Sequence, residues 1–273
     1  MKLEYKIKEN DKFNSVNDVL SNHFNISSRL HTKLVTNKMV CLNGNVCDTR
    51  NSVSIGDIVK INFDYEEDST NIVPTKMDLD IVFEDEWLLV VNKPARIAIH
   101  PSILHYEDSL CNGVKFYFDS IGLKKKIRPV NRLDKNTSGL VVFAKCEYIQ
   151  ECLIQQMQSN DFIKEYVAIA TGCFENNKGT IDLPISRKDG SIIERCISET
   201  GQKAITHYEV LQEFENYSLV KCTLETGRTH QIRVHMASIR SSSFRWWFIW
   251  FYFFPNFKAS SSLFTSRIFT SSR

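Results

Sequence analysis

One carboxylate, that of Asp134, lies between the cationic residues Arg132 and Lys135 in a polar, turn-rich segment that leads directly into an apolar strand. A carboxylate beside cations favours its ionised form, which suits a nucleophile or a base rather than an acid. The same composition also fits a solvated loop held by structural ion pairs, and composition alone favours that interpretation. Residues 128–140 are therefore a candidate catalytic loop that needs support from elsewhere in the chain.

A second segment, residues 225–236, is rich in hydrogen-bond donors and follows an expected strand. Strand-like alternation would place Gln231, Arg233 and His235 on one face. Such a segment is either a polar sheet edge or the source of an arginine that reaches a carboxylate or a phosphate. His230 and His235 have no third metal-type ligand nearby in the sequence, so we expect neither a zinc site nor a metal cofactor.

Residues 1–63 are expected to form a small α+β unit ahead of these segments. Its expected elements are a helix near Val19, a helix from the Ser27 cap to Lys38, a hairpin turn at Asn43-Gly44 and a strand at 58–61. Residues 1–62 contain nine Lys and Arg against six Asp and Glu, a net charge of +3. The unit is either a packing module or an anion-binding surface, whose second helix would present basic side chains to phosphates: Arg29, His31, Lys33 and Lys38.

An acidic and polar stretch, residues 64–78, is expected to be a linker to a body that spans residues 79–239. The body has more expected strands than helices, and the two do not alternate regularly. The strands are expected at 81–83, 88–91, 140–144, 166–170, 203–214 and 218–224, and the helices around 110–118 and 149–157. This order favours an α+β fold with a mixed, mainly antiparallel sheet over a doubly wound fold.

The composition narrows the class of protein. The 273 residues are 42% hydrophobic and 24% charged with a net charge of +2, which excludes a disordered or strongly polybasic chain. Residues 1–239 carry 29 Lys and Arg against 32 Asp and Glu, a net charge of −3. Eight cysteines without a Cys-x-x-Cys pair, and a start without an apolar secretion signal, indicate a reduced, cytoplasmic protein. The longest apolar run, 246–254, is about half of a bilayer span, so no membrane partner is expected.

Taken together, the motifs resemble those of the RNA pseudouridine synthases that act on uridines of ribosomal RNA. The catalytic signature of that family is similar to Arg132-Leu133-Asp134-x-x-Thr137-Ser138-Gly139-Leu140, and its first motif is similar to Asn92-Lys93-Pro94 with His100-Pro101. Its tyrosine motif is similar to Lys164-x-Tyr166-x-Ala168. Its arginine motif is similar to Gly227-Arg228-Thr229-His230-Gln231-Ile232-Arg233-Val234-His235. Residues 13–62 resemble a small RNA-binding domain first named from a ribosomal small-subunit protein, through Ser28-Arg29, Val40-x-Leu42-Asn43-Gly44 and Ile55-Gly56-Asp57-Ile58-Val59.

The resemblance implies a role for each motif. Asp134 would be the nucleophile that attacks the uridine on the base or at the anomeric carbon of the sugar. Tyr166 would stack on the flipped base, Arg233 would pair with Asp134, and Arg132 would fill space near the vacated stack. The residues expected to contact RNA are Arg132, Arg29, Lys33, Lys38, Arg228 and His230. The isomerisation needs no redox agent and no metal, so no cofactor is expected, and the chain is expected to act as a monomer on structured, ribosomal RNA.

Two positions depart from the family pattern. Asn131 stands where the family often has His, and this position is not the nucleophile. Arg96 stands where the family usually has Gly, which is expected to alter a turn.

The tail, residues 240–273, has a composition of its own, with no acidic residue, no glycine, twelve aromatics and nine serines. The family continues at this point with Gly-His-Pro-Leu-Leu-Gly-Asp. Read one base later, codons for residues 240–245 can encode Gly-His-Pro-Leu-Leu-Gly, and the TGG codon of Trp250 must give Gly. We therefore expect a one-base frame error near Ile239–Arg240. The alternative to an active enzyme is a non-catalytic RNA-binding protein that lost turnover with its altered tail.

Overall fold

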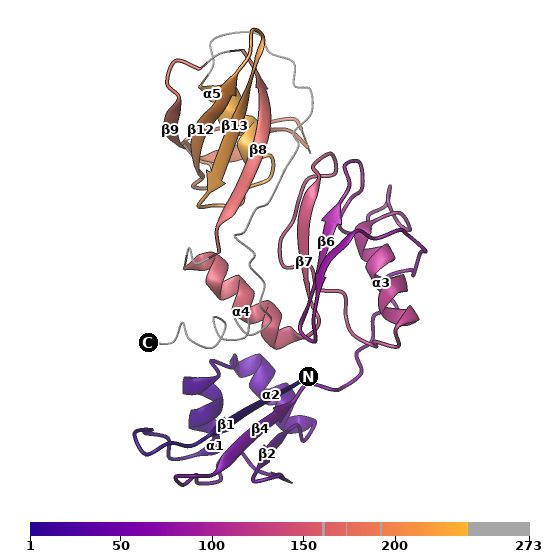
Figure 1. Cartoon of the computed structure of the whole chain (residues 1–273), viewed down its shortest axis with the longest axis vertical. Helices are drawn as coiled ribbons and strands as arrows, with labels where there is room; N and C mark the ends of the chain where they lie inside the picture. The colour runs from indigo at the N-terminus through magenta and orange to yellow at the C-terminus, as the bar shows by residue number, and fades with distance from the viewer. Residues whose placement is uncertain (160–161, 173, 192, 240–273) are drawn as a thin grey trace.

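The computed structural model describes residues 1–159, 162–172, 174–191 and 193–239. Within these ranges the chain forms three bodies, each built on a sheet, and every strand pairing between the named strands is antiparallel (Figure 1). The α+β fold with mainly antiparallel sheets expected from the sequence is confirmed. The interpretation of residues 240–273 as a frame-shifted tail lies outside the described residues.

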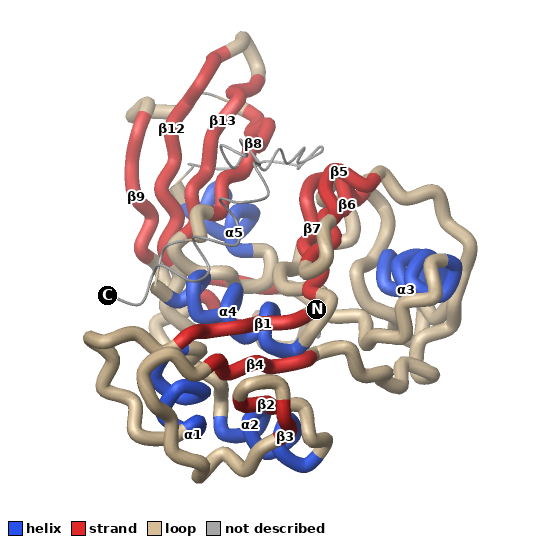
Figure 2. Tube along the Cα trace, turned by 60° about the horizontal axis from the view of Figure 1, so that its bottom comes forward, coloured by secondary structure: helices blue, strands red, loops and turns tan. Residues whose placement is uncertain are grey.

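The first body contains a four-stranded sheet in the order β1-β4-β2-β3, with short helices packed on it (Figure 2). Its elements are β1 (Lys2–Lys6), α1 (Val16–Asp18), the π-helical turn η1 (Val19–His23), α2 (Ser28–Thr36), β2 (Val40–Leu42), β3 (Asn45–Val46) and β4 (Ile58–Asn62). The expected Asn43-Gly44 hairpin is confirmed, since both residues have positive φ angles of 50° and 84°, as a tight two-residue turn requires.

The second helix is shorter than the sequence suggested, because α2 ends at Thr36 and not at Lys38. The Asn37 side chain donates a hydrogen bond to the carbonyl of Lys33 and so takes up one of the last helical acceptors. Lys38 then has a φ of 54°, which a helix cannot accommodate. Lys38 therefore lies in the turn after the helix and not in α2 itself.

The second body is a three-stranded sheet, β5-β6-β7, with a helix on each face. Its elements are β5 (Ile81–Glu84), β6 (Leu88–Lys93), α3 (Leu110–Ser120), β7 (Gly139–Ala144) and α4 (Glu147–Gln158). On one face Leu89, Val91, Val141 and Phe143 pack against Leu110, Val114 and Phe118 of α3. On the other face Leu88, Val90, Val142 and Ala144 pack with Tyr148, Ile149 and Leu153 of α4. Burial of both faces explains why these strands are apolar throughout.

The first body does not stand apart from α4 but shares its core with it. Phe63 at the end of β4 stacks on Tyr148 of α4, with 5.5 Å between the ring centroids. The Ser27 hydroxyl at the start of α2 donates a hydrogen bond of 2.8 Å to Glu151 of α4. The stretch that follows β4 has no helix or strand at residues 64–78, yet the Glu67 side chain in it is only 3% exposed.

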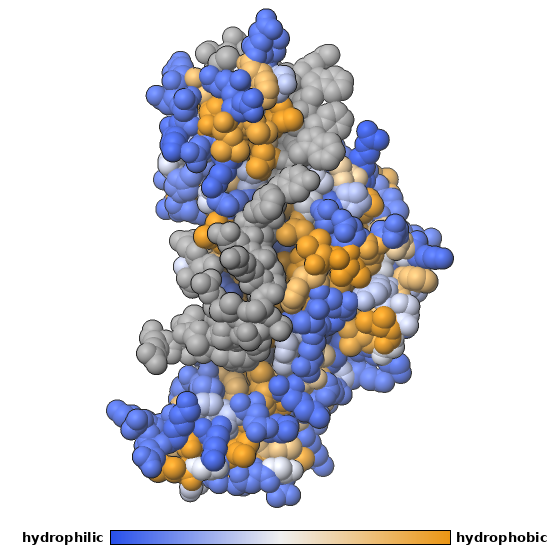
Figure 3. All heavy atoms as spheres, viewed as in Figure 1, coloured by the Kyte–Doolittle hydropathy of each residue, from blue (hydrophilic) through white to orange (hydrophobic). Residues whose placement is uncertain are grey.

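The third body is the sheet β8-β13-β12-β9 with a small hairpin and one helix. Its elements are β8 (Lys164–Thr171), β9 (Lys178–Asp182), β10 (Ile185–Arg187), β11 (Arg195–Ile197), β12 (Ile205–Glu213), β13 (Tyr217–Leu224) and α5 (Gln231–Ser238). In the view of Figure 3, apolar side chains gather over this body, whereas the surface of the first body is mostly hydrophilic. In the described part of the chain, no helix is both long and apolar enough to cross a membrane.

The expected strand-like alternation at Gln231–His235 is wrong, because these residues form helix α5. The i, i+4 pairs Gln231 with His235 and Ile232 with Met236 are all buried, as expected for the inner side of a helix. The polar members of this inner side concealed its helical period, since Gln and His do not count as apolar residues in a hydrophobic pattern. Arg233 lies outside this buried arc, and its side chain is partly exposed.

Candidate active site

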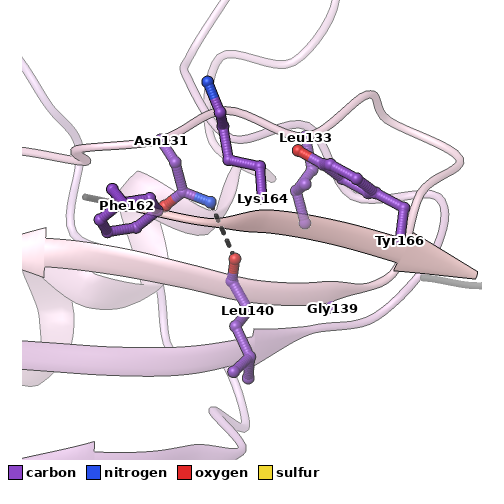
Figure 4. A pocket seen from close by; sticks show the side chains of 7 residues that line it. All are labelled: Asn131, Leu133, Gly139, Leu140, Phe162, Lys164 and Tyr166. Carbon is purple, nitrogen blue, oxygen red and sulfur yellow. Dashed lines mark hydrogen bonds between the residues drawn. The ribbon is translucent and has the colours of Figure 1, made fainter. Parts of the chain in front are cut away.

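The Asp134 loop is fixed to the central sheet by the Asn131 side chain. Asn131 accepts a hydrogen bond from the Val142 backbone N–H and donates one to the Leu140 carbonyl, each 2.9 Å long (Figure 4). The loop then turns back on itself, since the Thr137 N–H donates to the Asp134 carbonyl at 3.0 Å. The departure from the family at Asn131 therefore has a clear structural role: an amide that both donates and accepts closes the loop against β7.

Lys93, at the end of β6, is hydrogen-bonded to the same loop. Its side chain is completely buried, and its ammonium donates hydrogen bonds to the carbonyls of Pro94, Ile97 and Lys135 at 2.9, 2.9 and 3.2 Å. Burial lowers the pKa of Lys93 to about 8, although the charge of Asp134 acts in the opposite direction. Lys93 thus ties the segment after β6 to the residue that follows Asp134.

The start of α5 is held by two buried polar side chains. The Gln231 amide donates to the Ile205 carbonyl and the Thr206 hydroxyl, and its oxygen accepts from the Thr226 hydroxyl and the Arg228 N–H. His235 donates from Nε2 to the Leu183 carbonyl, so its Nδ1 accepts from the Thr206 hydroxyl. Burial lowers the pKa of His235, which favours this neutral form. These contacts lock α5 onto β12 and thereby fix the direction of Arg233.

Asp134 of the second body and α5 of the third body meet at one point. The Asp134 Oδ2 lies 3.5 Å from the Arg233 Nε and 3.9 Å from the His230 Nε2. His230 precedes α5 with a φ of 58°, a left-handed conformation that ends the preceding turn and starts the helix. The structure thus brings together three of the residues singled out in the sequence, from two motifs far apart in the chain.

Tyr166 of β8 borders a small pocket beside this point (Figure 4). The pocket is narrow and partly open to solvent, and it is lined by Asn131, Leu133, Gly139, Leu140, Phe162, Lys164 and Tyr166. The Tyr166 hydroxyl is directed toward Leu133, the neighbour of Asp134. Burial and the charge of Asp134 raise the pKa of Tyr166 to about 12, so the ring stays neutral at physiological pH. An aromatic face, apolar walls and a nearby carboxylate suit a planar, uncharged ring.

Arg132 is exposed next to the Asp134 loop, and its charge contributes, after burial, to a lowered pKa of His100 in the first motif. Arg96 is exposed in the same region and has a φ of 71°, a left-handed conformation that favours glycine. Arg96 was expected to alter a turn. In the structure this residue adopts a backbone conformation that suits glycine, although it is an arginine.

The remaining predicted RNA contacts differ in how free their charges are. Arg29 is 91% exposed on α2, and Lys38 is exposed in the turn that follows. Lys33 is instead bound within the protein, since its ammonium contacts Glu67 at 3.0 Å and Glu147 at 2.9 Å. Arg228 is exposed, with its Nε donating to the Lys203 carbonyl at 2.9 Å.

Sequence reasoning did not assign a role to three residues that build the site, namely Lys93, Asn131 and Gln231. Each is a polar residue next to a strand or helix end, and a buried polar side chain in such a place commonly satisfies backbone groups. Within the ranges that the structure describes, no group of three or more His, Cys, Asp or Glu side chains could hold a metal ion.

Comparison with known proteins agrees with this geometry. The profile of the family described as "RNA pseudouridylate synthase" matches residues 87–238. The chain is 35% identical over 241 residues to the ribosomal large subunit pseudouridine synthase D of Escherichia coli (strain K12), covering 88% of this chain and 73% of that protein. It is 35% identical over 241 residues to YlyB of Bacillus subtilis (strain 168), named an uncharacterized RNA pseudouridine synthase, covering 87% of this chain and 79% of YlyB.

Among solved structures, human RNA Pseudouridylate Synthase Domain Containing 1 has the same fold, with a TM-score of 0.50, 24% identity and coverage of 64% of this chain and 68% of that chain. The family match contains Asp134 and Arg233, which lie 3.5 Å apart, and Tyr166, which lines the neighbouring pocket. The chain belongs to the RNA pseudouridine synthase family and is by that membership an isomerase.

Proposed function

We propose that the protein converts specific uridines of large-subunit ribosomal RNA to pseudouridine, with Asp134 as the nucleophile. The observation that carries the proposal is the meeting of the Asp134 carboxylate with Arg233 at 3.5 Å, beside the pocket bordered by Tyr166. The ribosomal substrate is supported by the 35% identity to a ribosomal large subunit pseudouridine synthase, which covers 73% of that relative.

The proposed reaction needs the uridine to leave the base stack and enter the pocket, where Asp134 can reach it. A carboxylate oxygen of Asp134 attacks either the base or the anomeric carbon of the sugar. The bond between N1 of uracil and the anomeric carbon breaks, the detached ring turns, and carbon 5 forms the new bond to the sugar. The bond between Asp134 and the uridine then breaks and returns its electron pair to the carboxylate, which is thereby free for another cycle. Carbon 5 loses a proton and N1 gains one, so the product is an isomer of the substrate and no oxidant or reductant takes part.

Each neighbour of Asp134 has a proposed task that fits its position. The neutral ring of Tyr166 stacks on the extruded base, and Arg233 holds the carboxylate in line with it. Arg132, exposed beside the loop, occupies the gap that the base leaves in the RNA stack, because a guanidinium plane can replace a stacked base. His230 and Arg228 lie where they can contact the backbone around the flipped nucleotide.

The first body is proposed to bind structured RNA through Arg29, which is 91% exposed although its Nε lies 3.9 Å from Glu147, and through the exposed Lys38. Lys33 was expected to join them, but we now assign it to the contact between the bodies, because two carboxylates already hold its ammonium. Phosphate contacts release counterions, so the affinity of the full chain for RNA should fall steeply with salt. Binding that is independent of salt would contradict this part of the proposal.

Detection of pseudouridine tests the main proposal. The full chain is incubated with transcribed large-subunit ribosomal RNA, and pseudouridine is mapped by carbodiimide modification and primer extension. A new stop at defined uridines supports the enzyme. Retention of the RNA without any new stop supports the alternative, a non-catalytic RNA-binding protein. We further propose that the chain acts as a monomer in the cytoplasm, where its cysteines stay reduced.

The frame error near Ile239–Arg240 also remains a proposal, supported by the change of composition at residue 240. The DNA sequence across codons 236–252 tests it directly. If the DNA encodes residues 240–273 as they stand in this sequence, and this chain is soluble and fully active, the frame error is excluded. If one base is missing or extra, the corrected chain should be more soluble than the written one, because twelve aromatic side chains no longer lie in an unrelated tail.

A further inference from the structure

A tight turn beside the active site exposes two large apolar side chains. Ser102 and His105 form a two-residue hairpin, in which the Ser102 N–H donates to the His105 carbonyl at 3.1 Å and the His105 N–H donates back at 3.0 Å. Ile103 and Leu104 at its tip are 99% and 86% exposed. Side chains this exposed gain nothing from folding, and two of them side by side on a turn indicate a contact with another molecule.

The turn is tied to the residue after the nucleophile. The His105 Nε2 lies 2.9 Å from the Lys135 ammonium, and its Nδ1 lies 2.9 Å from the Asp108 carboxylate. An ammonium can only donate, so the Nε2 accepts from Lys135 and the Nδ1–H donates to Asp108. Lys135 also offers its carbonyl to Lys93, which binds the Ile97 carbonyl upstream of the turn. The turn is therefore held at a fixed position, because the Lys135 side chain connects it to the Asp134 loop.

The surroundings of the turn select the kind of partner. Lys135, which contacts His105, and Arg132, whose charge acts on His100, are exposed beside it. Glu107 and Asp108 follow the turn and are exposed too, with Asp108 accepting the hydrogen bond from His105. Cations that flank an apolar tip fit a nucleic acid, whose phosphates contact the cations while its bases face the tip. An apolar protein partner would require neither the cations nor the proximity to Asp134.

We propose that the Ile103–Leu104 turn is a wedge that packs against the base next to the extruded uridine and keeps the strand open. This inference rests on the proposed function, because it assumes that a uridine is extruded toward Asp134. Removal of a base from a stack costs a few kcal/mol, and proteins that open base steps commonly insert apolar side chains at the step. His105 is a positioning residue in this arrangement, since it acts on the RNA only through the turn that it anchors.

Site-specific crosslinking tests the contact without relying on turnover. The photoreactive amino acid p-benzoylphenylalanine is placed at Leu104 in the full chain, and in a control chain at Ile193, which is 67% exposed on the third body. Each chain is irradiated with transcribed large-subunit ribosomal RNA. We expect a crosslink from position 104 to one or two nucleotides and none from position 193. Equal crosslinking from both positions, or none from position 104 while RNA is retained, would overturn the wedge.

Substitution of the tip tests its effect on the reaction. In the double variant Ile103→Ser and Leu104→Ser we expect the single-turnover rate of pseudouridine formation to fall about tenfold, the loss typical for one missing stacking contact. The control Ile193→Ser should keep the wild-type rate. An unchanged rate in the double variant would contradict the wedge. Absence of pseudouridine with both the wild-type chain and the frame-corrected chain would instead contradict the proposed function, and the crosslinking experiment would still decide whether the turn contacts RNA.

Discussion

The Arg233 Nε faces the Asp134 Oδ2 at 3.5 Å, yet it is buried and makes no hydrogen bond in the described structure. The two groups attract each other as charges, but their geometry lacks the alignment of a bidentate pair. Because Asp134 belongs to the second body and Arg233 to the third, a small approach of the two bodies would complete the hydrogen bond. Catalytic hydrogen bonds are often long before substrate binds, and this contact has that character.

Replacement of Asp134, the proposed nucleophile, should abolish turnover without loss of fold. Asp134→Asn keeps the size of the side chain but removes the nucleophilic oxygen, so the rate should fall by about 10⁴-fold or more. The Asp134 side chain is 30% exposed, and the thermal midpoint should change little. Carbodiimide mapping and thermal unfolding of the same preparations measure both effects. Turnover of Asp134→Asn above a no-enzyme control would remove Asp134 from the nucleophile role.

Arg233 should matter more for rate than for stability. Its side chain is 32% exposed, so loss of the pair in Arg233→Ala should cost only about 1 kcal/mol of stability. The rate should fall about 100-fold, as when one charge-stabilising group is removed from an active site. Arg233→Lys is the matched control, since it keeps the charge and should retain part of the activity. If Arg233→Ala unfolds the protein, the role of Arg233 is mainly structural.

Glu67→Gln should weaken the contact between the first body and the rest of the chain. Glu67 is held by Arg128 at 2.6 and 2.7 Å and by Lys33 at 3.0 Å. Burial raises the pKa of this carboxyl, but the hydrogen bonds and charges of Arg128 and Lys33 outweigh burial and hold it at about 2. Removal of the negative charge leaves Arg128 without its carboxylate partner and Lys33 with Glu147 alone, and it should cost about 3 kcal/mol.

The pH dependence of this variant gives an independent check. The folded-state pKa of Glu67 lies below its ordinary value of 4.5, so its contribution is complete above pH 4.5 and is lost as the pH falls toward 2. The stability difference between wild type and Glu67→Gln should therefore shrink over that range. Denaturant unfolding at several pH values measures it, with the exposed and equally conservative Glu66→Gln as the control. A constant difference down to the acid limit would exclude Glu67 as the titrating group.

Lys93→Met should change how stability depends on alkaline pH. The folded-state pKa of Lys93 is about 8, against 10.5 for an ordinary lysine, so between these values the unfolded chain binds more protons. Stability of the wild type therefore gains a contribution from Lys93 as the pH rises through this window. The variant should lack that rise, and it should be less stable at neutral pH because three carbonyls lose their donor. Identical slopes for both proteins would contradict the lowered pKa.

Arg96→Gly should relieve backbone strain. The left-handed conformation costs a residue with a side chain about 1 kcal/mol, whereas glycine adopts it freely. The greater freedom of glycine in the unfolded chain offsets part of this gain. We expect a thermal midpoint equal to or above that of the wild type, and a lower one for Arg96→Val. A clear loss of stability in Arg96→Gly would show that the arginine side chain contributes contacts that outweigh the strain.

Much of the fold follows from local sequence signals. The Asn43-Gly44 turn and the apolar strands at 88–91 and 140–144 are predicted because glycine-tolerant turns and continuous apolar runs leave few alternatives. The helix α5 is missed because the residues of its inner side are Gln231 and His235, whose burial depends on partners in β12 and near β9. A polar residue buried by a distant partner carries no local hydrophobic signal.

The candidate site shows the same division. Asp134, Tyr166 and Arg233 are found from motifs, but the distances that join them depend on how α5 is placed against the second body. The role of Lys33 could not be read from its helix, because the decisive partners are Glu67 in an irregular stretch and Glu147 in α4. The sequence of a helix does not show whether one of its basic residues binds a phosphate of RNA or a carboxylate of the protein.

The shared core between the first body and α4 has a consequence for substrate choice. Phe63 and Tyr148 stack inside this core, so Arg29 and Asp134 are separated by rigid protein and not by a flexible tether. Because this separation is fixed, the proposed function requires the RNA to present phosphates to Arg29 and a uridine to Asp134 at the same time. A folded RNA with the right spacing meets both demands at no further cost, whereas a short single strand has to be ordered first. In the proposed function, the choice of one uridine among many can thus come from RNA shape.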